Sequence, residues 1–367
     1  MLQLLLGGSG SGKTTLLYQR IRARAEKGEK SILLVPEQFT SSTEGRIYRE
    51  LGDALSGMVE SFSFTSLAEK ILSTEGGAAV QTLSDAGRAV LVRRALEELQ
   101  DNVHYYHRHR RSAAFCQMAA QTIDELKSAG LSGQQLAQLA GACGAESGKL
   151  SELALIFQGY ETLLARSGMD PSDRLELAGA RLEEALARHS LPEFLRDRAV
   201  FIDEFDTFNA PKKRLLGAML AALPSVTVAL CDDGAPLLPG DLSLFSGAKQ
   251  VAAQLRQLAR KNGAEVAVPQ LLRKDLRHRN APGLAAVAEL LETGSCTADA
   301  PADEVRLFAA PSREEEARAA AGAIRRLMRQ GVRCGKIAVV CRDIAKYRAA
   351  VRYEFRMAEI PLYCDEP

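Results

Sequence analysis

Short apolar runs alternate with amphipathic segments along the first part of the chain. Such runs, about five residues long, are typical of strands buried on both faces of a parallel sheet. The segments between them carry apolar residues three and four positions apart, which predicts helices. The pattern predicts strands at 2–6, 31–35 and 58–62, and helices at about 14–28, 41–51 and 66–72. This order favours a doubly wound parallel α/β sheet.

The pattern changes between residues 83 and 195, where we predict no strand. Alanine and leucine at helical spacing predict helices at about 84–100, 111–128, 132–141, 149–167 and 171–188. Asp170 suits the N-cap of the last helix and Pro171 its first position. We therefore interpret residues 84–195 as an all-helical insertion.

The alternating pattern resumes at residue 199. It predicts strands at 199–204, 226–230 and 264–268, and helices from about 210, at 247–262 and after Pro282. Residues 294–303 are small and polar and predict a linker. A second α/β unit follows, with strands at 304–309 and 336–341, a helix capped by Ser312 and Glu315, and a helix from about 343. The predicted division is a sheet domain at 1–83 and 196–293, the helical insertion at 84–195, and a partial second sheet domain at 304–367.

Composition excludes several classes of protein. The 367 residues suggest two or three domains, and a net charge of +1 gives no overall field toward nucleic acid or membrane. No run of about 18 apolar residues occurs, so no membrane span is expected. The seven cysteines form no C-x-x-C pair, which is typical of reduced thiols in a cytoplasmic protein. The chain ends just after a predicted strand, so we expect it to be part of a longer protein.

One glycine-rich segment carries the clearest chemistry. Residues 7–14 read Gly-Gly-Ser-Gly-Ser-Gly-Lys-Thr and match G-x-x-x-x-G-K-[ST], the P-loop that binds nucleotide phosphates. A predicted strand precedes it and a predicted helix follows, which aims backbone N–H groups at an anion. Lys13 would reach the β- and γ-phosphates of ATP and Thr14 would bind Mg²⁺; the alternative is a chance glycine-rich loop. The predicted nucleotide-binding residues are Gly7, Gly8, Ser9, Gly10, Ser11, Gly12, Lys13, Thr14 and Thr15.

A second motif ends the predicted strand at 199–204. An apolar strand that ends in two acidic residues has the form of a Walker B motif. Asp203 would hold Mg²⁺ through water, and Glu204 would orient or deprotonate the attacking water as the catalytic residue. The alternative is a carboxylate that caps the helix expected after Asn209.

A local cluster of cations and aromatic residues lies in the helical insertion. Residues 105–111 read Tyr-Tyr-His-Arg-His-Arg-Arg, a mixture found in proteins that bind single-stranded DNA. The candidate DNA-binding residues are Tyr105, Arg108, Arg110 and Arg111. A solvated loop between helices explains the same composition, and both interpretations stay open.

The order of these segments resembles a known family. The P-loop, the segments at 34–40, 60–68 and 201–206, and the segment at 337–343 follow one another as in a UvrD/PcrA-type superfamily 1 helicase core. Within that class, Val35-Pro36-Glu37-Gln38 and the segment at 149–161 resemble the AddB family. The resemblance implies a RecA-like fold with the start of a second RecA-like domain, ATP and Mg²⁺ as cofactors, single-stranded DNA as a ligand, and a heterodimer with an AddA-type helicase–nuclease subunit. It also implies a role in double-strand break repair by homologous recombination.

Departures from the helicase pattern bear on activity. Only six residues precede Gly7, so the adenine-contacting glutamine of true translocases is missing, and no glutamine follows Asp232-Asp233 before Leu238. Arg277 and Arg279 are both candidates for the arginine of the Asn-Tyr-Arg-Ser motif. The resemblance therefore implies a helicase-like module that does not translocate, binds ATP with little turnover and has no nuclease activity. A free-standing P-loop ATPase or kinase is the alternative.

Overall fold

The computed structural model describes residues 1–77, 79, 81–144, 147–295 and 304–364. Their contacts divide into two compact units. The first unit holds residues 1–280 and the second holds the described residues from 304 onward, while α12 (Pro282–Thr293) is shared between them. None of the helices in the described part of the chain is long and apolar enough to cross a lipid bilayer.

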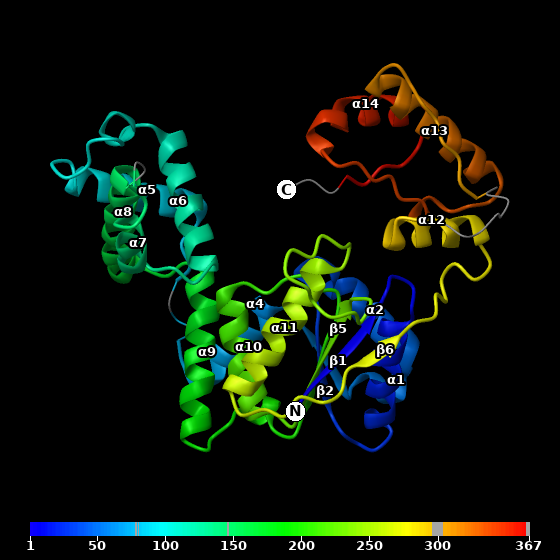
Figure 1. Cartoon of the computed structure of the whole chain (residues 1–367), viewed down its shortest axis with the longest axis horizontal. Helices are drawn as coiled ribbons and strands as arrows, with labels where there is room; N and C mark the ends of the chain where they lie inside the picture. The colour runs from blue at the N-terminus through cyan, green and yellow to red at the C-terminus, as the bar shows by residue number, and fades with distance from the viewer. Residues whose placement is uncertain (78, 80, 145–146, 296–303, 365–367) are drawn as a thin grey trace. The chain divides into compact units, whose positions relative to one another are not determined.

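A six-stranded sheet forms the centre of the first unit (Figure 1). The strands are β1 (Leu2–Gly7), β2 (Ser31–Leu34), β3 (Val59–Phe62), β4 (Ala199–Ile202), β5 (Ser225–Cys231) and β6 (Gln270–Leu272). Their order is β3-β2-β4-β5-β1-β6, and every neighbouring pair is parallel. The first five strands confirm the predicted ones. Four of them, β1, β2, β4 and β5, are apolar almost throughout because they are buried on both faces of the sheet, whereas β3 is a partly buried edge strand.

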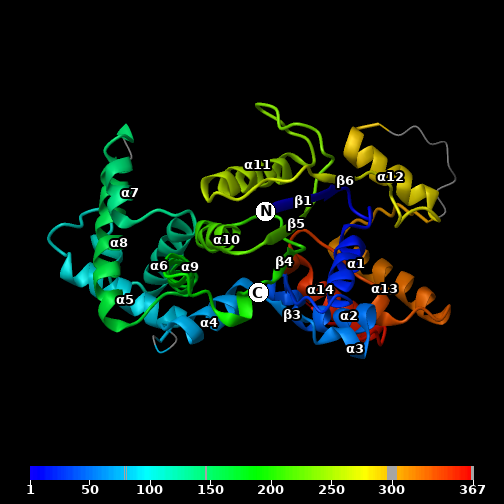
Figure 2. The ribbon, with the colours of Figure 1, turned by 90° about the horizontal axis from the view of Figure 1, so that it is seen from below.

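Helices cover both faces of this sheet (Figures 1 and 2). The helices α1 (Lys13–Ala25) and α2 (Thr40–Leu51) share one apolar cluster with Leu5, Leu33 and Phe201 of the strands. The other cluster contains the alternate strand residues, such as Leu4 and Ile202, together with side chains of helices on the opposite face. Those helices are α4 (Phe64–Glu75), α9 (Pro171–Ala187), α10 (Ala210–Ala222) and α11 (Ser246–Lys261). Strand residues therefore alternate between two cores.

The five helices predicted between residues 83 and 195 are all present. They are α5 (Asp85–Glu98), α6 (Ala113–Ser128), α7 (Gly133–Ala140), α8 (Ser147–Ser167) and α9. The first four pack around a core of their own that includes the fully buried Phe157 and Tyr160. By contrast, α9 contributes Leu175 and Leu182 to the core of the sheet and packs against α10 and α4. Asp170 and Pro171 occupy the predicted N-cap and first position of α9.

A buried polar network joins three of these helices. The Nζ of Lys127 donates to the carboxylates of Asp170 at 2.8 Å and Asp173 at 2.9 Å, and the hydroxyl of Tyr160 donates to Asp170 at 2.6 Å. Lys127 closes α6, Tyr160 lies on α8 and both aspartates begin α9. Because each buried charge has a partner, the network orients the bundle of α5–α8 on the helix that packs against the sheet.

Two predictions about element boundaries in the first unit are wrong. The helix predicted from Ser66 begins at Phe64 as α4, and a capping box joins Ser63 to Ser66 at its start. The strand predicted at 264–268 is reduced to one bridge between Val266 and Leu2, and the edge strand β6 lies a few residues later.

The second unit contains α13 (Arg313–Arg329) and α14 (Ile344–Met357), which pack together. Both helices were predicted, and Ser312 caps α13 by accepting from the backbone N–H of Glu315 at 3.3 Å. The strands predicted at 304–309 and 336–341 are not strands in the described residues. Leu307 is fully exposed and Val340 is 90% exposed, so these apolar runs have no neighbouring strand to pair with. The linker predicted at 294–303 lies outside the described residues from 296 onward.

Candidate nucleotide site

The glycine loop, defined here as residues 7–14, connects β1 to α1 with a backbone that only glycine adopts easily. Gly10 and Gly12 have φ angles of +78° and +92°. A Cβ atom at Gly10 would lie 2.7 Å from Cβ of Arg277, and one at Gly7 would lie 2.7 Å from the carbonyl oxygen of Leu272. The loop therefore needs glycine at these positions both for its dihedral angles and for its close approach to the chain after β6.

Polar groups of the glycine loop are arranged to receive an anion. Gly12 precedes α1 without a side-chain cap in the described residues, so no capping side chain competes with a ligand for the first N–H groups of that helix. The Nζ of Lys13 donates to the carbonyl oxygens of Gly7 at 2.7 Å and Gly8 at 2.8 Å, which holds the ammonium over the loop. The buried Oγ of Ser11 has no hydrogen-bond partner among the described residues. These groups fit a phosphate chain.

The predicted acid pair lies at the end of β4, beside the glycine loop. Asp203 is only 6% exposed, and its carboxylate accepts a hydrogen bond from the hydroxyl of Thr14. Its Oδ1 also accepts from the backbone N–H of Glu204 at 3.0 Å. Neither carboxylate caps α10, because the side chain of Asn209 does so by accepting from the N–H of Lys212 at 3.1 Å. The alternative role considered for the acid pair is therefore excluded.

The backbone at Glu204 is strained. Its φ angle of +66° lies in the left-handed region, which few residues other than glycine, asparagine and aspartate adopt. Such outliers cluster at functional sites, where the surrounding structure holds them in place. The unusual backbone turns the chain directly after Asp203.

Burial and neighbouring charges set the ionisation of these groups. Burial raises the pKa of Asp203, and hydrogen bonds from Thr14 and Glu204 oppose this rise. The pKa of Glu204 is raised by burial and by the charge of Asp203, and lowered by Arg46. Burial lowers the pKa of Lys13, although Cys231 and Asp203 offset part of that effect. A divalent cation and a phosphate chain would neutralise the crowded charges of both signs.

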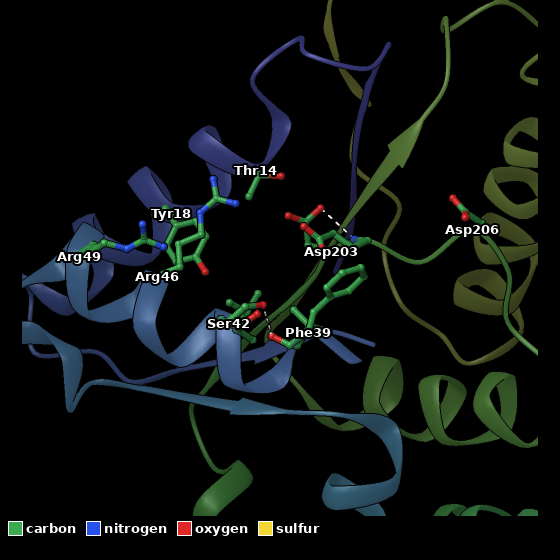
Figure 3. Close-up of a pocket in the computed structure, with 12 residues that line it drawn as sticks. Thr14, Tyr18, Phe39, Ser42, Arg46, Arg49, Asp203 and Asp206 are labelled. Atoms are coloured by element: carbon green, nitrogen blue, oxygen red, sulfur yellow. Dashed lines mark hydrogen bonds between the residues drawn. The ribbon is translucent and has the colours of Figure 1, made fainter. Parts of the chain in front are cut away.

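A pocket of about 570 Å³ brings these groups together. Its lining comprises Ser9, Gly10, Gly12, Lys13, Thr14, Thr15, Arg46, Asp203, Glu204, Phe205, Asp206, Ala229, Cys231, Leu276 and Arg277. It lies at the carboxyl ends of β1, β4 and β5, where the helices after β1 and β5 leave toward opposite faces of the sheet. Open α/β sheets bind ligands at such switch points. A second pocket, of about 540 Å³, shares Thr14, Arg46, Asp203 and Glu204 with it (Figure 3).

Comparison with known proteins identifies the family. A family model described as "ADDB, N-terminal" matches residues 4–288. The chain belongs to the AddB family. A relative from Desulforudis audaxviator, named as the B subunit of an ATP-dependent helicase/deoxyribonuclease, is 34% identical over 378 residues, which cover 99% of this chain and 32% of that protein. Relatives of the same name from Symbiobacterium thermophilum and Clostridium perfringens are 32% and 29% identical over 99% and 100% of this chain, and 32% of each relative is covered. The chain thus spans about a third of the length of these curated relatives.

In this AddB-family chain, the structure separates the two arginines that the sequence left open. The Nη1 of Arg277 donates to the hydroxyl of Ser9 in the glycine loop at 3.1 Å, and Arg277 lines the pocket. Arg279 is not among the lining residues. Of the two arginines, Arg277 is the one that lines this pocket.

Two side chains at the site carried no signal in the sequence. Tyr18 on α1 and Arg46 on α2 line the pocket of Figure 3, and the guanidinium carbon of Arg46 lies 5.0 Å from the centroid of the Tyr18 ring. Both residues sit on amphipathic helices outside any motif. Helical periodicity could have placed them near the glycine-loop end of the sheet, but not inside the pocket.

The candidate DNA-binding segment lies in the loop between α5 and α6, and none of its residues lines the pocket. Tyr105, Arg108 and Arg111 are exposed and Arg110 is half-buried. Tyr106 stacks on Phe115 of α6 with ring centroids 5.3 Å apart. The AddB-family chain thus presents three of the four candidate side chains to solvent from an anchored loop, which is compatible with both interpretations.

No group of three or more histidine, cysteine, aspartate or glutamate side chains in the described part of the chain could hold a metal ion.

Proposed function

We propose that this chain is the ATP-binding, DNA-handling N-terminal part of the B subunit of an ATP-dependent helicase–exonuclease. One observation carries the proposal: Lys13, Thr14 and Asp203 converge on one pocket at the carboxyl edge of a parallel sheet. The family supports the proposed link to a helicase–exonuclease, because the names of the relatives combine ATP dependence with helicase and deoxyribonuclease activity. The proposed process is double-strand break repair by homologous recombination in the cytoplasm.

Each residue at the site has a proposed role within a RecA-like P-loop domain. The N–H groups of the glycine loop and the ammonium of Lys13 bind the phosphates. The N-terminus of a helix attracts anions, and an ammonium forms charge-assisted hydrogen bonds with phosphate oxygens. The hydroxyl of Thr14 and the carboxylate of Asp203 hold Mg²⁺, which prefers oxygen ligands and retains several water molecules. Glu204 orients the attacking water. When bound, Mg²⁺ neutralises charge on the β- and γ-phosphates.

The proposed module binds nucleotide without translocating. The chain has no glutamine between Asp232-Asp233 and Leu238, where the helicase pattern has one. We propose that it works in a heterodimer with an AddA-type subunit and that its basic segment contacts single-stranded DNA. Residues 304–367 would begin a second RecA-like domain.

The test is the Mg²⁺ dependence of ATP binding, measured by calorimetry on the 367-residue chain. We expect Mg²⁺ to strengthen binding in the wild type and to have little effect in Thr14→Val, which keeps the side-chain shape but loses the hydroxyl. Thr162→Val is the matched control, because Thr162 is an exposed helical threonine whose hydroxyl bonds only the carbonyl of Gln158. A wild-type chain that binds no ATP with or without Mg²⁺ would overturn the proposal.

A further inference from the structure

Arg46 enters the nucleotide pocket from a helix that carries none of the sequence motifs. It lies in the middle of α2, which packs beside α1 on one face of the sheet. Its side chain lines both pockets described above and so adjoins Thr14, Asp203 and Glu204. Figure 3 shows Tyr18 and Arg46 side by side, on the α1 and α2 side of the pocket, facing Thr14 and Asp203. The guanidinium therefore joins Lys13 and Arg277 among the cations that line the pocket of about 570 Å³.

The ring of Tyr18 supports this guanidinium. The ring is 5% exposed, and the centre of the Arg46 guanidinium lies 5.0 Å from its centroid. A cation over an aromatic face is held by the ring quadrupole, while the edge of the guanidinium keeps its N–H donors available. Burial raises the pKa of Tyr18 to about 12, so the phenol stays neutral and adds no competing negative charge.

Arg46 has no direct acceptor among the described residues, unlike the buried Arg174 and Arg198. Arg174 pairs with Glu69 and Arg198 pairs with Glu60, each at 2.5 Å. In the described residues Arg46 is half-buried, yet its guanidinium makes no ion pair and no hydrogen bond there. The positive charge of Arg46 lowers the pKa values of Asp203 and Glu204 by electrostatic attraction, without a hydrogen bond or ion pair in the described residues. Since burying a cation without an acceptor is costly, this geometry points to an anionic ligand that Arg46 receives.

We propose that Arg46 binds the terminal phosphate of a nucleoside triphosphate and makes this site prefer ATP to ADP. The inference rests on the nucleotide site proposed above. The glycine loop and Lys13 line this pocket, and Arg46 lines it together with Glu204. The carboxylate that orients a water for attack must lie next to the γ-phosphate, so an arginine that lines the same pocket as that carboxylate can reach this phosphate. A diphosphate would leave Arg46 without this partner.

The experiment compares ATP and ADP affinities of four versions of the 367-residue chain by calorimetry with Mg²⁺. In Arg46→Ala we expect the Kd for ATP to rise about tenfold or more, as for loss of a charge-assisted hydrogen bond, and the Kd for ADP to change by less than about twofold. Arg46→Lys keeps the charge but not the planar donors and should recover part of the preference. Arg22→Ala is the control: it removes an arginine side chain from an exposed position on the neighbouring helix α1, and Arg22 lines neither of the two pockets.

The outcomes separate this inference from the nucleotide site itself. If the wild type binds neither nucleotide, the proposed function fails and Arg46 has nothing to discriminate. If the wild type binds ATP but Arg46→Ala weakens ATP and ADP by the same factor, Arg46 does not read the terminal phosphate and the inference is wrong. Equal preference for ATP in Arg46→Ala and in Arg22→Ala would also overturn it. Thermal denaturation of each variant without nucleotide confirms that the chain is folded, because α2 contributes Ile47 and Leu51 to the core.

Discussion

The carboxylate of Glu152 holds the backbone N–H of Tyr105 with both oxygens, Oε1 at 3.0 Å and Oε2 at 2.9 Å. The same carboxylate accepts from the N–H groups of His104 at 2.8 Å and Tyr106 at 3.2 Å. Glu152 is 7% exposed and lies on α8. Its carboxylate therefore fixes the start of the basic segment, residues 105–111, which lies more than 40 positions earlier in the chain. Three donors satisfy a buried carboxylate that would otherwise be costly. The segment is therefore anchored at one end rather than loose.

We expect Glu152→Gln to lower the free energy of unfolding by about 1–3 kcal/mol, because one carboxylate oxygen becomes an amide that cannot accept. Amide hydrogen exchange at residues 104–106 should quicken at the same time. Denaturant titration and exchange measurements check both effects. Glu97→Gln, an exposed glutamate on α5, serves as the control and should change stability very little. Unchanged exchange at 104–106 would mean that other contacts hold the segment.

Removing the ammonium of Lys13 tests the glycine loop directly. We expect Lys13→Ala to weaken ATP binding by about ten- to a hundredfold, since a charge-assisted phosphate contact contributes roughly 1.5–3 kcal/mol. Calorimetric titration with Mg–ATP measures the loss. Lys27→Ala, just beyond the far end of α1, removes an exposed lysine and should leave affinity unchanged. Equal affinities in the wild type and Lys13→Ala would contradict the assignment.

The basic segment can be tested through the salt dependence of single-stranded DNA binding. We expect neutralisation of Arg108, Arg110 and Arg111 to glutamine to weaken binding and to flatten the plot of log affinity against log salt, by about 0.7 for each phosphate that is no longer neutralised. The double variant Arg93→Gln with Arg94→Gln is the control, because those exposed arginines already pair with glutamates on α5. An unchanged salt slope in the triple variant would favour the solvated-loop interpretation.

Turnover should be slow even where ATP binds well. In the helicase class that the chain resembles, a second domain supplies an arginine to the γ-phosphate, and a missing arginine of this kind lowers the rate by about 10³–10⁵. We expect phosphate release by the 367-residue chain to stay barely above background with or without single-stranded DNA, and no unwinding or cutting of a duplex. Robust DNA-stimulated release that Glu204→Gln abolishes would show a complete motor site instead.

The buried carboxylate of Asp203 should make stability depend on pH. Burial raises its pKa above the ordinary value of 3.8, so the ionised form destabilises the protein when nothing is bound. This penalty is fully present above the folded-state pKa and disappears as the pH falls below the unfolded value. We therefore expect Asp203→Asn to raise the free energy of unfolding at pH 7 without Mg²⁺ or nucleotide, and the gain to shrink as the pH approaches 3.8.

Denaturant titrations at several pH values measure that gain. Asp206→Asn is the control, because Asp206 lines the same pocket but is exposed. A gain from Asp203→Asn that persists unchanged at low pH would show that removal of charge is not its cause.

The sequence predicts the sheet well where strands are central. β1, β2, β4 and β5 are buried on both faces, so their apolar runs identify them directly. β6 has only three half-buried residues at the edge, and no pattern separates it from Val266, which makes a single bridge. The start of α4 was missed because Ser63 and Ser66 both suit an N-cap, and only tertiary packing of Phe64 decides between them.

Part of the candidate site could likewise be predicted from the sequence, and part could not. Contiguous motifs revealed Lys13, Thr14, Asp203 and Glu204, because a phosphate loop and an acid pair need fixed spacings. Arg46 and Tyr18 could not be found, since their position depends on how α2 packs against α1. The runs at 304–309 and 336–341 look like strands because they are apolar, but a strand also needs a neighbour, which no local pattern reveals.

The left-handed backbone at Glu204 bears on why a glutamate occupies that position. A non-glycine residue there carries about 1–3 kcal/mol of strain, which glycine would avoid. Selection for stability alone would therefore favour glycine or asparagine at residue 204. The glutamate in this chain therefore costs stability, which a role of its carboxylate in nucleotide chemistry would explain.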